Sequence, residues 1–391
     1  MHKLFTIFAV LMLVASSPDR TFAAADPYEI SAVLSLTGPG AFTSKAIAQS
    51  LTLIEQRVNK TGGIQGHPLK ITYLDDGTVP QTAVALVNQQ VAKGVPLIFG
   101  PAFAATCLAT MPIVAANGPV SICYSPVVHP HRGDFMFSSG INADDQVRAY
   151  LKYFEDRGWM RLAILTSTDA TGQLLERAYD GLLAQPEYRT LQVVTREHFN
   201  PSEVSVAAQL AHVHAANPDV FVVGVTGAAF GTVLRGISDA GLNVPVASSF
   251  GNATYAQMEQ YKALLPKTVL FSGMRAMSRQ GTGPGPIRDE QKIYFGLFDA
   301  AGIRPDAGNV SIWDLSVAAV DALKHLGIHA TAGAVRAYIE NLHGWVGIND
   351  VYDFRDPEHR GTGTSAVVVD RWDPATNSFV AVSRPGGAAV R

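Results

Sequence analysis

The sequence has little cysteine, no strong charge of either sign and, after its first 25 residues, no long apolar run. Its formal net charge is only −3, which gives no electrostatic footprint for nucleic acid or for an anionic membrane surface. No segment after residue 25 has the roughly 18 uncharged apolar residues that a membrane-spanning helix needs. These absences exclude a nucleic-acid-binding protein and an integral membrane protein for the body of the chain.

Motifs of cofactor and nucleophile chemistry are also missing. Gly38-Pro39-Gly40 lacks the third glycine of a dinucleotide loop, and the segment 281–286 is too rich in proline to open a helix. No G-x-S-x-G turn occurs. His129 and His131 share a loop with only Asp134 nearby, so a metal site there is a weak alternative to a solvated loop. We therefore expect no catalytic residues, no metal and no cofactor.

The first 25 residues are typical of a secretory leader. A basic start at Lys3 precedes the uncharged apolar run 4–15, and small residues lead to Ala23-Ala24-Ala25 before Asp26. The apolar run is too short to anchor in a bilayer, and the A-x-A pattern suits cleavage. A buried N-terminal helix is the alternative. The leader predicts export, and in a bacterium a periplasmic location.

The two cysteines, Cys107 and Cys123, fit one disulfide in an oxidising compartment. Cys107 falls in the first turn of an expected helix, 104–116, and Cys123 ends the expected strand 119–123. In a parallel α/β unit both positions lie on the same rim of the sheet. The alternative is two separate buried thiols.

Strand and helix patterns alternate along the chain, which predicts an α/β fold with parallel sheets. Helical spacing of apolar residues is clear at Ile47, Leu51, Ile54 and Val58. The expected strands are 28–36, 69–74, 95–99, 119–123, 162–165, 191–194, 220–223 and 244–247, and the expected helices are 44–59, 80–91, 104–116, 144–154, 171–183, 204–216, 228–240, 288–300 and 312–326. The chain then ends in strand-like sequence after Val351.

This order predicts two doubly wound lobes with a ligand cleft between them. We expect residues 26–143 and 275–350 in lobe 1, and residues 144–274 and 351–391 in lobe 2. Parallel sheets bind ligands at the carboxyl ends of their strands. At that rim lie 102–106, where free helix amides favour an anion, and 125–131, which includes His129. Helix capping by Thr106 and a solvated His129 are the alternatives.

Five segments in series resemble a known family. They are AVLSLTGPGA (32–41), NKTGGIQGHPLKITYLDD (59–76), FGP (99–101), NPDVFVVG (217–224) and DAGLNVPV (239–246). Together they are similar to the type I periplasmic binding proteins that serve ABC transporters of the branched-chain amino acid type. The resemblance implies two lobes joined by three hinge crossovers, a monomer that closes around a small-molecule ligand, and delivery to a membrane permease.

The sequence departs from the family pattern where amino-acid binders hold their ligand. Amino-acid binders of the family usually have a serine after the Gly-Pro pair, an aromatic residue in the second lobe, and an acidic residue that holds the amino group. In this sequence the corresponding positions are Ala104, Thr171 and Phe250. Without that acid an α-ammonium group would be buried unpaired. The pattern therefore favours an aromatic or hydrophobic carboxylate, with Phe42 and Phe250 against its flat face.

Thr106, His129, Thr171 and Arg275 are the candidates to hold a carboxylate. The whole expected ligand-binding set is Phe42, Ala104, Ala105, Thr106, Val128, His129, Thr171, Thr226, Phe250, Asn252 and Arg275. A branched-chain or other amino acid is the alternative ligand for the same scaffold. A secreted α/β enzyme is the alternative from another class, and it would need a pair of titratable groups in the cleft.

Overall fold

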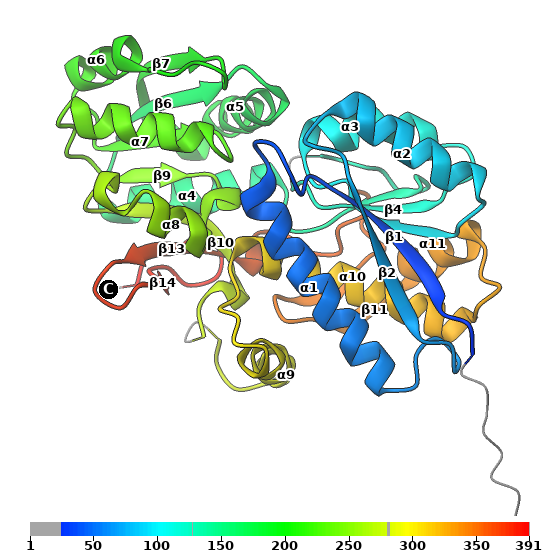
Figure 1. The fold of residues 1–391 in the computed structure, drawn as a ribbon. Helices are drawn as coiled ribbons and strands as arrows, with labels where there is room; N and C mark the ends of the chain where they lie inside the picture. The colour runs from blue at the N-terminus through cyan, green and yellow to red at the C-terminus, as the bar shows by residue number, and fades with distance from the viewer. Residues whose placement is uncertain (1–24, 127, 280–281, 391) are drawn as a thin grey trace, which may run out of the picture.

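The computed structural model describes residues 25–126, 128–279 and 282–390, which form two α/β lobes side by side (Figure 1). The expected leader lies outside these residues except for Ala25. Within the described part of the chain, no helix combines the length and the apolar character needed to cross a membrane.

Lobe 1 is built on a five-stranded, fully parallel sheet in the order β2-β1-β3-β4-β5. Helices α1 and α10 pack together, as do α2 and α3, and right-handed crossovers put these pairs on opposite faces. The strands are β1 (Tyr28–Leu34), β2 (Leu69–Asp75), β3 (Leu97–Phe99), β4 (Val120–Cys123) and β5 (Met136–Ser138), and the helices are α1 (Ala41–Lys60), α2 (Pro80–Ala92), α3 (Ala104–Val114), α10 (Ala307–Leu326) and α11 (Ala332–Asn341).

Lobe 2 is built on a seven-stranded sheet in the order β14-β13-β10-β9-β8-β6-β7. Five strands are parallel, β13 is antiparallel to its neighbour β10, and β14 is antiparallel to β13, so it runs in the direction of the five. The strands are β6 (Arg161–Ser167), β7 (Gln192–Phe199), β8 (Val220–Gly224), β9 (Val246–Ser248), β10 (Val269–Met274), β13 (Val367–Asp373) and β14 (Ser378–Ala381), and the helices are α4 (Ala143–Arg157), α5 (Ala170–Leu183), α6 (Ala207–Ala216), α7 (Ala229–Asp239) and α8 (Tyr255–Gln260).

The chain passes between the two sheets three times, after β5, after β10 and after the small hairpin β11 (His343–Val346) and β12 (Val351–Asp353). Helix α9 (Pro286–Ala300) follows the second crossing. The predicted α/β fold of two doubly wound lobes joined by three crossovers is therefore confirmed. Because β12 pairs with β11, the third crossing comes after Asp353.

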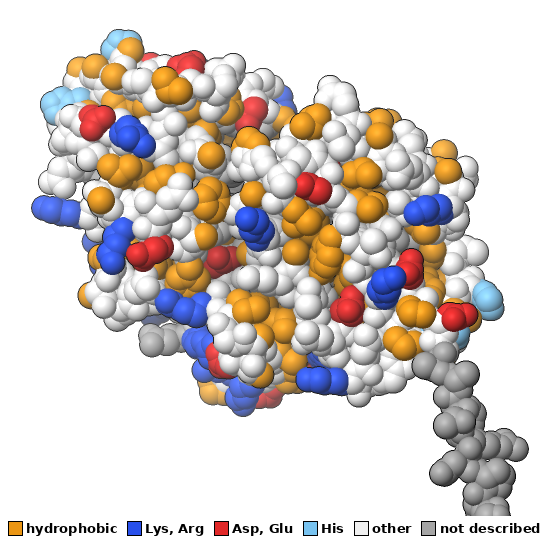
Figure 2. Space-filling model, in the orientation of Figure 1, with side chains coloured by type: hydrophobic (Ala, Val, Ile, Leu, Met, Phe, Trp, Pro, Cys, Tyr) orange, Lys and Arg blue, Asp and Glu red, His pale blue; other side chains and the backbone are white. Residues whose placement is uncertain are grey.

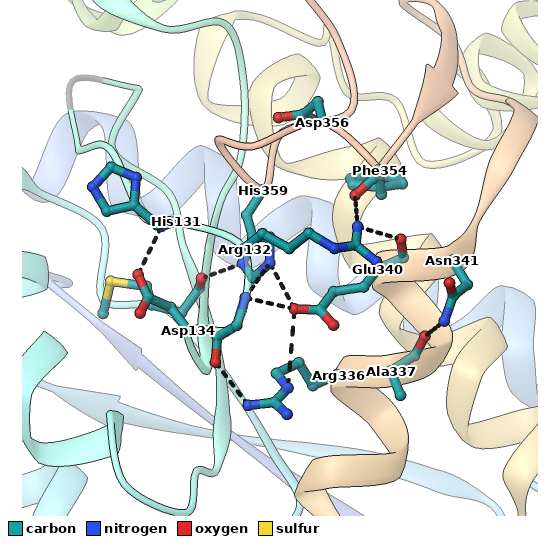
Figure 3. A network of polar contacts seen from close by, with 12 residues as sticks. His131, Arg132, Asp134, Arg336, Ala337, Glu340, Asn341, Phe354, Asp356 and His359 are labelled. Atoms are coloured by element: carbon teal, nitrogen blue, oxygen red, sulfur yellow. Dashed lines mark hydrogen bonds and ion pairs between the residues drawn. The ribbon is translucent and has the colours of Figure 1, made fainter.

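Buried polar contacts fasten the third crossing to lobe 1 (Figure 3). His359 is fully buried, its Nε2 lies 2.8 Å from Glu340 Oε1 of α11, and its ring stacks on Phe137 of β5. The Gly133 amide donates to the same Glu340 oxygen at 2.9 Å. The crossing is thus held against the loop between β4 and β5 as well as against α11.

The local sequence explains how closely the strands approach in lobe 1. Gly100, which follows β3, has a φ of +83°, and a Cβ there would lie 2.0 Å from the carbonyl oxygen of Val33 in β1. Only glycine fits this contact. The rim where β3 ends and α3 begins is therefore held close to the end of β1, which is where the cleft opens.

The predicted disulfide is present. Cys107 in the first turn of α3 is bonded to Cys123 at the end of β4, with their Cα atoms 5.9 Å apart. Both residues are buried. The bridge ties the start of α3 to the neighbouring strand on the rim that faces lobe 2.

Candidate functional site

A cleft of about 590 Å³, counted with its open mouth, lies between the lobes. It receives residues from the loops and first helical turns at the carboxyl ends of both sheets, and also from α10. The lining consists of Thr43, Ala102, Phe103, Tyr124, Ser125, Pro126, Gln146, Thr171, Leu175, Thr226, Ser249, Phe250, Gly251, Ala307 and Ser311. A wider mouth region adjoins it and shares Phe103, Thr171 and Thr226.

No charged side chain is found among the described residues that line this inner cleft. The mouth region contributes one, Asp169. Its carboxylate already accepts hydrogen bonds from the Ser167 hydroxyl at 2.7 Å and from the Gly172 amide at 3.1 Å, as the N-cap of α5. A ligand in the inner cleft therefore meets dipoles and rings rather than a formal charge.

Three aromatic rings line the inner cleft: Phe103 at the start of α3, Tyr124 after β4, and Phe250 after β9. Phe250 is 5% exposed. The Tyr124 hydroxyl lies 2.9 Å from the Ser316 hydroxyl, and burial raises the pKa of Tyr124, so it stays neutral. Tyr124 thus presents its ring and not its hydroxyl to the cleft.

Hydroxyl groups supply most of the polar lining. Ser125 and Ser311 come from lobe 1, and Thr171 and Thr226 come from lobe 2. None of these four hydroxyls has a hydrogen-bond partner among the residues that the structure describes. Free hydroxyls from both lobes that face one cleft are suited to bind a ligand that accepts or donates hydrogen bonds.

The first turns of two helices border the mouth of the cleft, through Ala105 of α3 and through Ala170 and Thr171 of α5. No hydrogen-bond acceptor for these three amides is found among the described residues. First-turn amides have no partner within their own helix, and together with the helix dipole they favour an anion. The mouth therefore offers free amides without a cationic side chain, and at α5 these amides lie beside the carboxylate of the cap, Asp169.

The lobes contact each other across the cleft. The Thr43 hydroxyl of α1 donates to the Gly251 carbonyl at 3.1 Å, and α3 contacts α5. Gly227 of lobe 2, with a φ of +74°, approaches lobe 1 so closely that a Cβ would lie 2.7 Å from the Pro39 carbonyl oxygen. The two lobes are therefore in contact in this structure, and their surfaces meet in the space-filling view (Figure 2).

Four of the expected ligand-binding residues are brought together here. Thr171, Thr226 and Phe250 line the inner cleft, and Ala105 lines its mouth. Phe42 does not line either region, because its neighbour Thr43 is the residue of the first turn of α1 that turns toward the cleft. Phe42 is instead half-exposed.

Three further expected residues are used by the fold. The Thr106 hydroxyl donates to the Phe103 carbonyl at 3.0 Å and accepts from its amide at 3.3 Å, so it caps α3. The side chain of Ala104 is buried at the same turn. The Asn252 side chain donates to the Val225 carbonyl and accepts from the Gly227 amide, which orders the loop after β8.

The remaining three lie at the crossings. The His129 Nδ1 is 3.7 Å from Glu358 Oε2, and burial, together with nearby Arg360, lowers the pKa of His129. Val128 is buried and its carbonyl accepts from the Arg360 guanidinium. Arg275 follows β10 and donates to the Ser365 carbonyl at 2.8 Å. None of the three lines the inner cleft or its mouth.

Sequence reasoning missed several lining residues. Gln146 lies in α4, just after the first crossing, and Ser311 lies in α10, nearly two hundred residues after β4. Phe103, Ser125 and Ser249 do fall within segments that were expected to reach the rim. For Gln146 the only signal in the sequence is its place near the start of α4, the helix that follows the first crossing, and Ser311 of α10 has no such signal.

A family model described as periplasmic binding protein matches residues 27–374 of the chain. The Leu/Ile/Val-binding protein BraC3 of Rhizobium johnstonii is 24% identical over 61% of this chain and 65% of its own length. A Leu/Ile/Val-binding protein homologue of Brucella melitensis is 22% identical over 57% of this chain and 61% of its own length. The chain thus spans a little under two thirds of these curated relatives.

Solved structures share the fold over almost the whole chain. An extracellular ligand-binding receptor of Rhodopseudomonas palustris superposes with a TM-score of 0.78 at 16% identity, covering 92% of this chain and 100% of that one. The LivJ substrate-binding protein of Streptococcus pneumoniae, in complex with isoleucine, superposes with a TM-score of 0.77 at 15% identity, covering 91% and 99%. The chain belongs to the periplasmic binding protein family and has its two-lobed type I fold.

Proposed function

We propose that this protein is the solute-binding component of an ABC importer, exported to the periplasm by its first 25 residues. It captures an aromatic or hydrophobic carboxylate between its lobes and delivers it, as a monomer, to a membrane permease. The observation that carries the ligand class is the make-up of the cleft: its inner part has three aromatic rings and no charged side chain among its described residues, and its mouth is bordered by the first turns of α3 and α5.

The aromatic rings and the amides suit different parts of such a ligand. Phe103, Tyr124 and Phe250 offer flat apolar surfaces for a ring. The free amides of α3 and α5, with the hydroxyls of Thr171 and Ser125, offer donors for a carboxylate. A zwitterionic amino acid would also bring an ammonium group, which would be buried without a carboxylate partner and would lose several kcal/mol of hydration.

A branched-chain amino acid is the second candidate, and the names of the curated relatives favour it. Asp169 is the acid that would have to serve the ammonium group, because it is the one charged side chain on the described mouth lining. An enzyme would require a pair of titratable groups within hydrogen-bond distance in the cleft. Asp169, already the cap of α5, is the single titratable carboxylate on the described lining.

Binding acts by shifting the population of open and closed lobes. A ligand that contacts Thr171 and Phe250 from lobe 2 and Ser125 and Phe103 from lobe 1 stabilises the closed state, since it has both sets of contacts only there. The permease then distinguishes loaded from empty protein by the relative position of the lobes.

A thermal-shift panel of leucine, isoleucine, benzoate and cinnamate on the mature protein tests this proposal. A true ligand at a hundredfold excess over its Kd stabilises the folded state by about 2.7 kcal/mol, which is a readily measured shift. We expect a shift with the aromatic acids and none with leucine or isoleucine. A shift with leucine or isoleucine alone would establish the second candidate instead.

A further inference from the structure

A second cavity lies directly behind the cleft, inside lobe 2. It is lined by α4, α5 and the ends of β8, β9 and β10, and it shares Gln146, Leu175 and Ser249 with the cleft. Its own residues are Val147, Tyr150, Tyr179, Val222, Val223, Gly224, Ala247, Ser248 and Ser272. We call this cavity the annex. The annex is narrow, with room for a water-sized group rather than for a second ring.

The annex is mostly apolar, has no charged side chain along its described lining, and contains a few hydroxyl groups. The Tyr150 hydroxyl donates to the Ser248 carbonyl at 2.8 Å, and the Ser272 hydroxyl donates to Gln146 Oε1 at 3.1 Å. Tyr179 is only 3% exposed, and its hydroxyl has no hydrogen-bond partner among the residues that the structure describes. This hydroxyl is not one of the fully enclosed, unpaired polar atoms, so it keeps access to open space and is available to a water or to a ligand.

We infer that the annex is a specificity subsite, which receives a hydroxyl group carried at the end of the ligand opposite its carboxylate. This inference rests on the proposed function and narrows its ligand class to hydroxylated aryl carboxylates. In this arrangement the ligand carboxylate binds the free helix amides at the cleft, and the ligand ring lies against Phe250. The ligand hydroxyl then extends between Gln146 and Leu175 toward Tyr179.

Because the described annex lining carries no charge, we expect the annex to exclude ligands that place a charged group in it. A carboxylate or an ammonium in place of the hydroxyl would be buried with neither counter-charge nor water, at a much larger cost than a neutral group. A methyl group of similar size would leave Tyr179 unpaired. The annex therefore selects by hydrogen bonding and by charge, beyond what size alone achieves.

Isothermal titration of the mature protein with benzoate, 4-hydroxybenzoate and 4-carboxybenzoate tests the inference. We expect 4-hydroxybenzoate to bind about five-fold more tightly than benzoate, the effect of one hydrogen bond to a buried neutral group. We expect 4-carboxybenzoate to bind more weakly than either. In the Tyr179→Phe variant the ratio between the first two should fall to about one, whatever the absolute affinities become.

Tyr153→Phe is the matched control, because Tyr153 is a buried tyrosine of α4 outside the annex lining. It should keep the five-fold ratio. Equal binding of benzoate and 4-hydroxybenzoate to the unmodified protein would overturn the subsite and leave the aromatic carboxylate proposal standing. Tight binding of 4-carboxybenzoate, or an unchanged ratio in Tyr179→Phe, would also overturn it. Binding of none of the three acids would overturn the subsite, and the proposed function would fall with it if cinnamate also gave no thermal shift.

Discussion

The hydroxyl of Thr43 donates a hydrogen bond to the carbonyl of Gly251 at 3.1 Å, across the boundary between the lobes. Thr43 is in α1 of lobe 1 and Gly251 follows β9 in lobe 2, so this bond exists only while the lobes are closed. Both residues also line the cleft. A bond of this kind contributes to ligand affinity without touching the ligand, because it favours the state that binds.

Replacing Thr43 by valine removes the donor and keeps the shape of the side chain. We expect the ligand to bind about 2- to 10-fold more weakly, the effect of one net hydrogen bond of about 0.5–1.5 kcal/mol. Titration calorimetry measures the affinity. Thr52→Val is the control, since Thr52 lies on the same helix and its hydroxyl bonds within lobe 1. Equal affinities in the two variants would contradict a role for the bond in closure.

The ring of Phe250 is the aromatic contact that lobe 2 offers to the ligand. Phe250→Leu keeps an apolar side chain but loses stacking, which is worth about 0.5–1.5 kcal/mol beyond burial. We therefore expect aromatic acids to bind about 2- to 10-fold more weakly to this variant. Phe271→Leu, in the core of lobe 2 away from the cleft, controls for a general loss of packing. If Phe271→Leu weakened binding as much as Phe250→Leu, stacking would not be the cause.

Much of the fold could be predicted from local sequence, and the reason is visible in α1. Its buried face includes Ile47, Leu51, Ile54 and Val58, a spacing that only a helix brings together. β5 and β10 were missed, because β5 is very short and β10 includes Ser272 and Gly273, which are poor strand formers. The antiparallel return of β13 beside β10 depends on tertiary pairing that no local pattern specifies.

The candidate site was less predictable, because it depends on helix phase and on distant segments. A shift of one position along α1 brings Thr43 rather than Phe42 to the cleft. The Thr106 hydroxyl is used by its own helix, so the contribution of that turn to the cleft is its free amides. Gln146 and Ser311 reach the cleft only because the crossings bring α4 and α10 beside it, which is a property of the whole fold.

The Cys107–Cys123 disulfide should stabilise the protein substantially. It closes a segment with a sequence separation of 16, for which the chain-entropy account gives roughly 3 kcal/mol. We expect the Cys107→Ala/Cys123→Ala double variant to unfold in urea with a free energy lower by about that amount. Adding a reductant should lower the stability of the unmodified protein and leave the double variant unchanged. Equal stabilities with and without reductant would show that the bridge contributes little.

Asp306 should make the protein less stable as the pH rises. Its side chain caps α10, accepting from the amides of Gly308 and Tyr255 at 3.2 Å each, and burial raises its pKa to about 7. The ordinary value is 3.8, so between about pH 4 and pH 7 the folded state holds a proton that the unfolded chain has released. The free energy of unfolding therefore falls as the pH rises through this window and levels off above it.

Asp306→Asn keeps an acceptor at the cap and cannot ionise. We expect its Tm to fall less between pH 5 and pH 8 than that of the unmodified protein. Part of the fall should persist, because burial also raises the pKa of Asp314 to about 6. Asp289→Asn, at an exposed ion pair with Lys292, should leave the pH dependence unchanged. Asp306→Asn losing as much stability over this range as the unmodified protein would contradict the prediction. Asp306 would then be charged in the folded state already at pH 5, because its hydrogen bonds to Gly308 and Tyr255 would outweigh its burial.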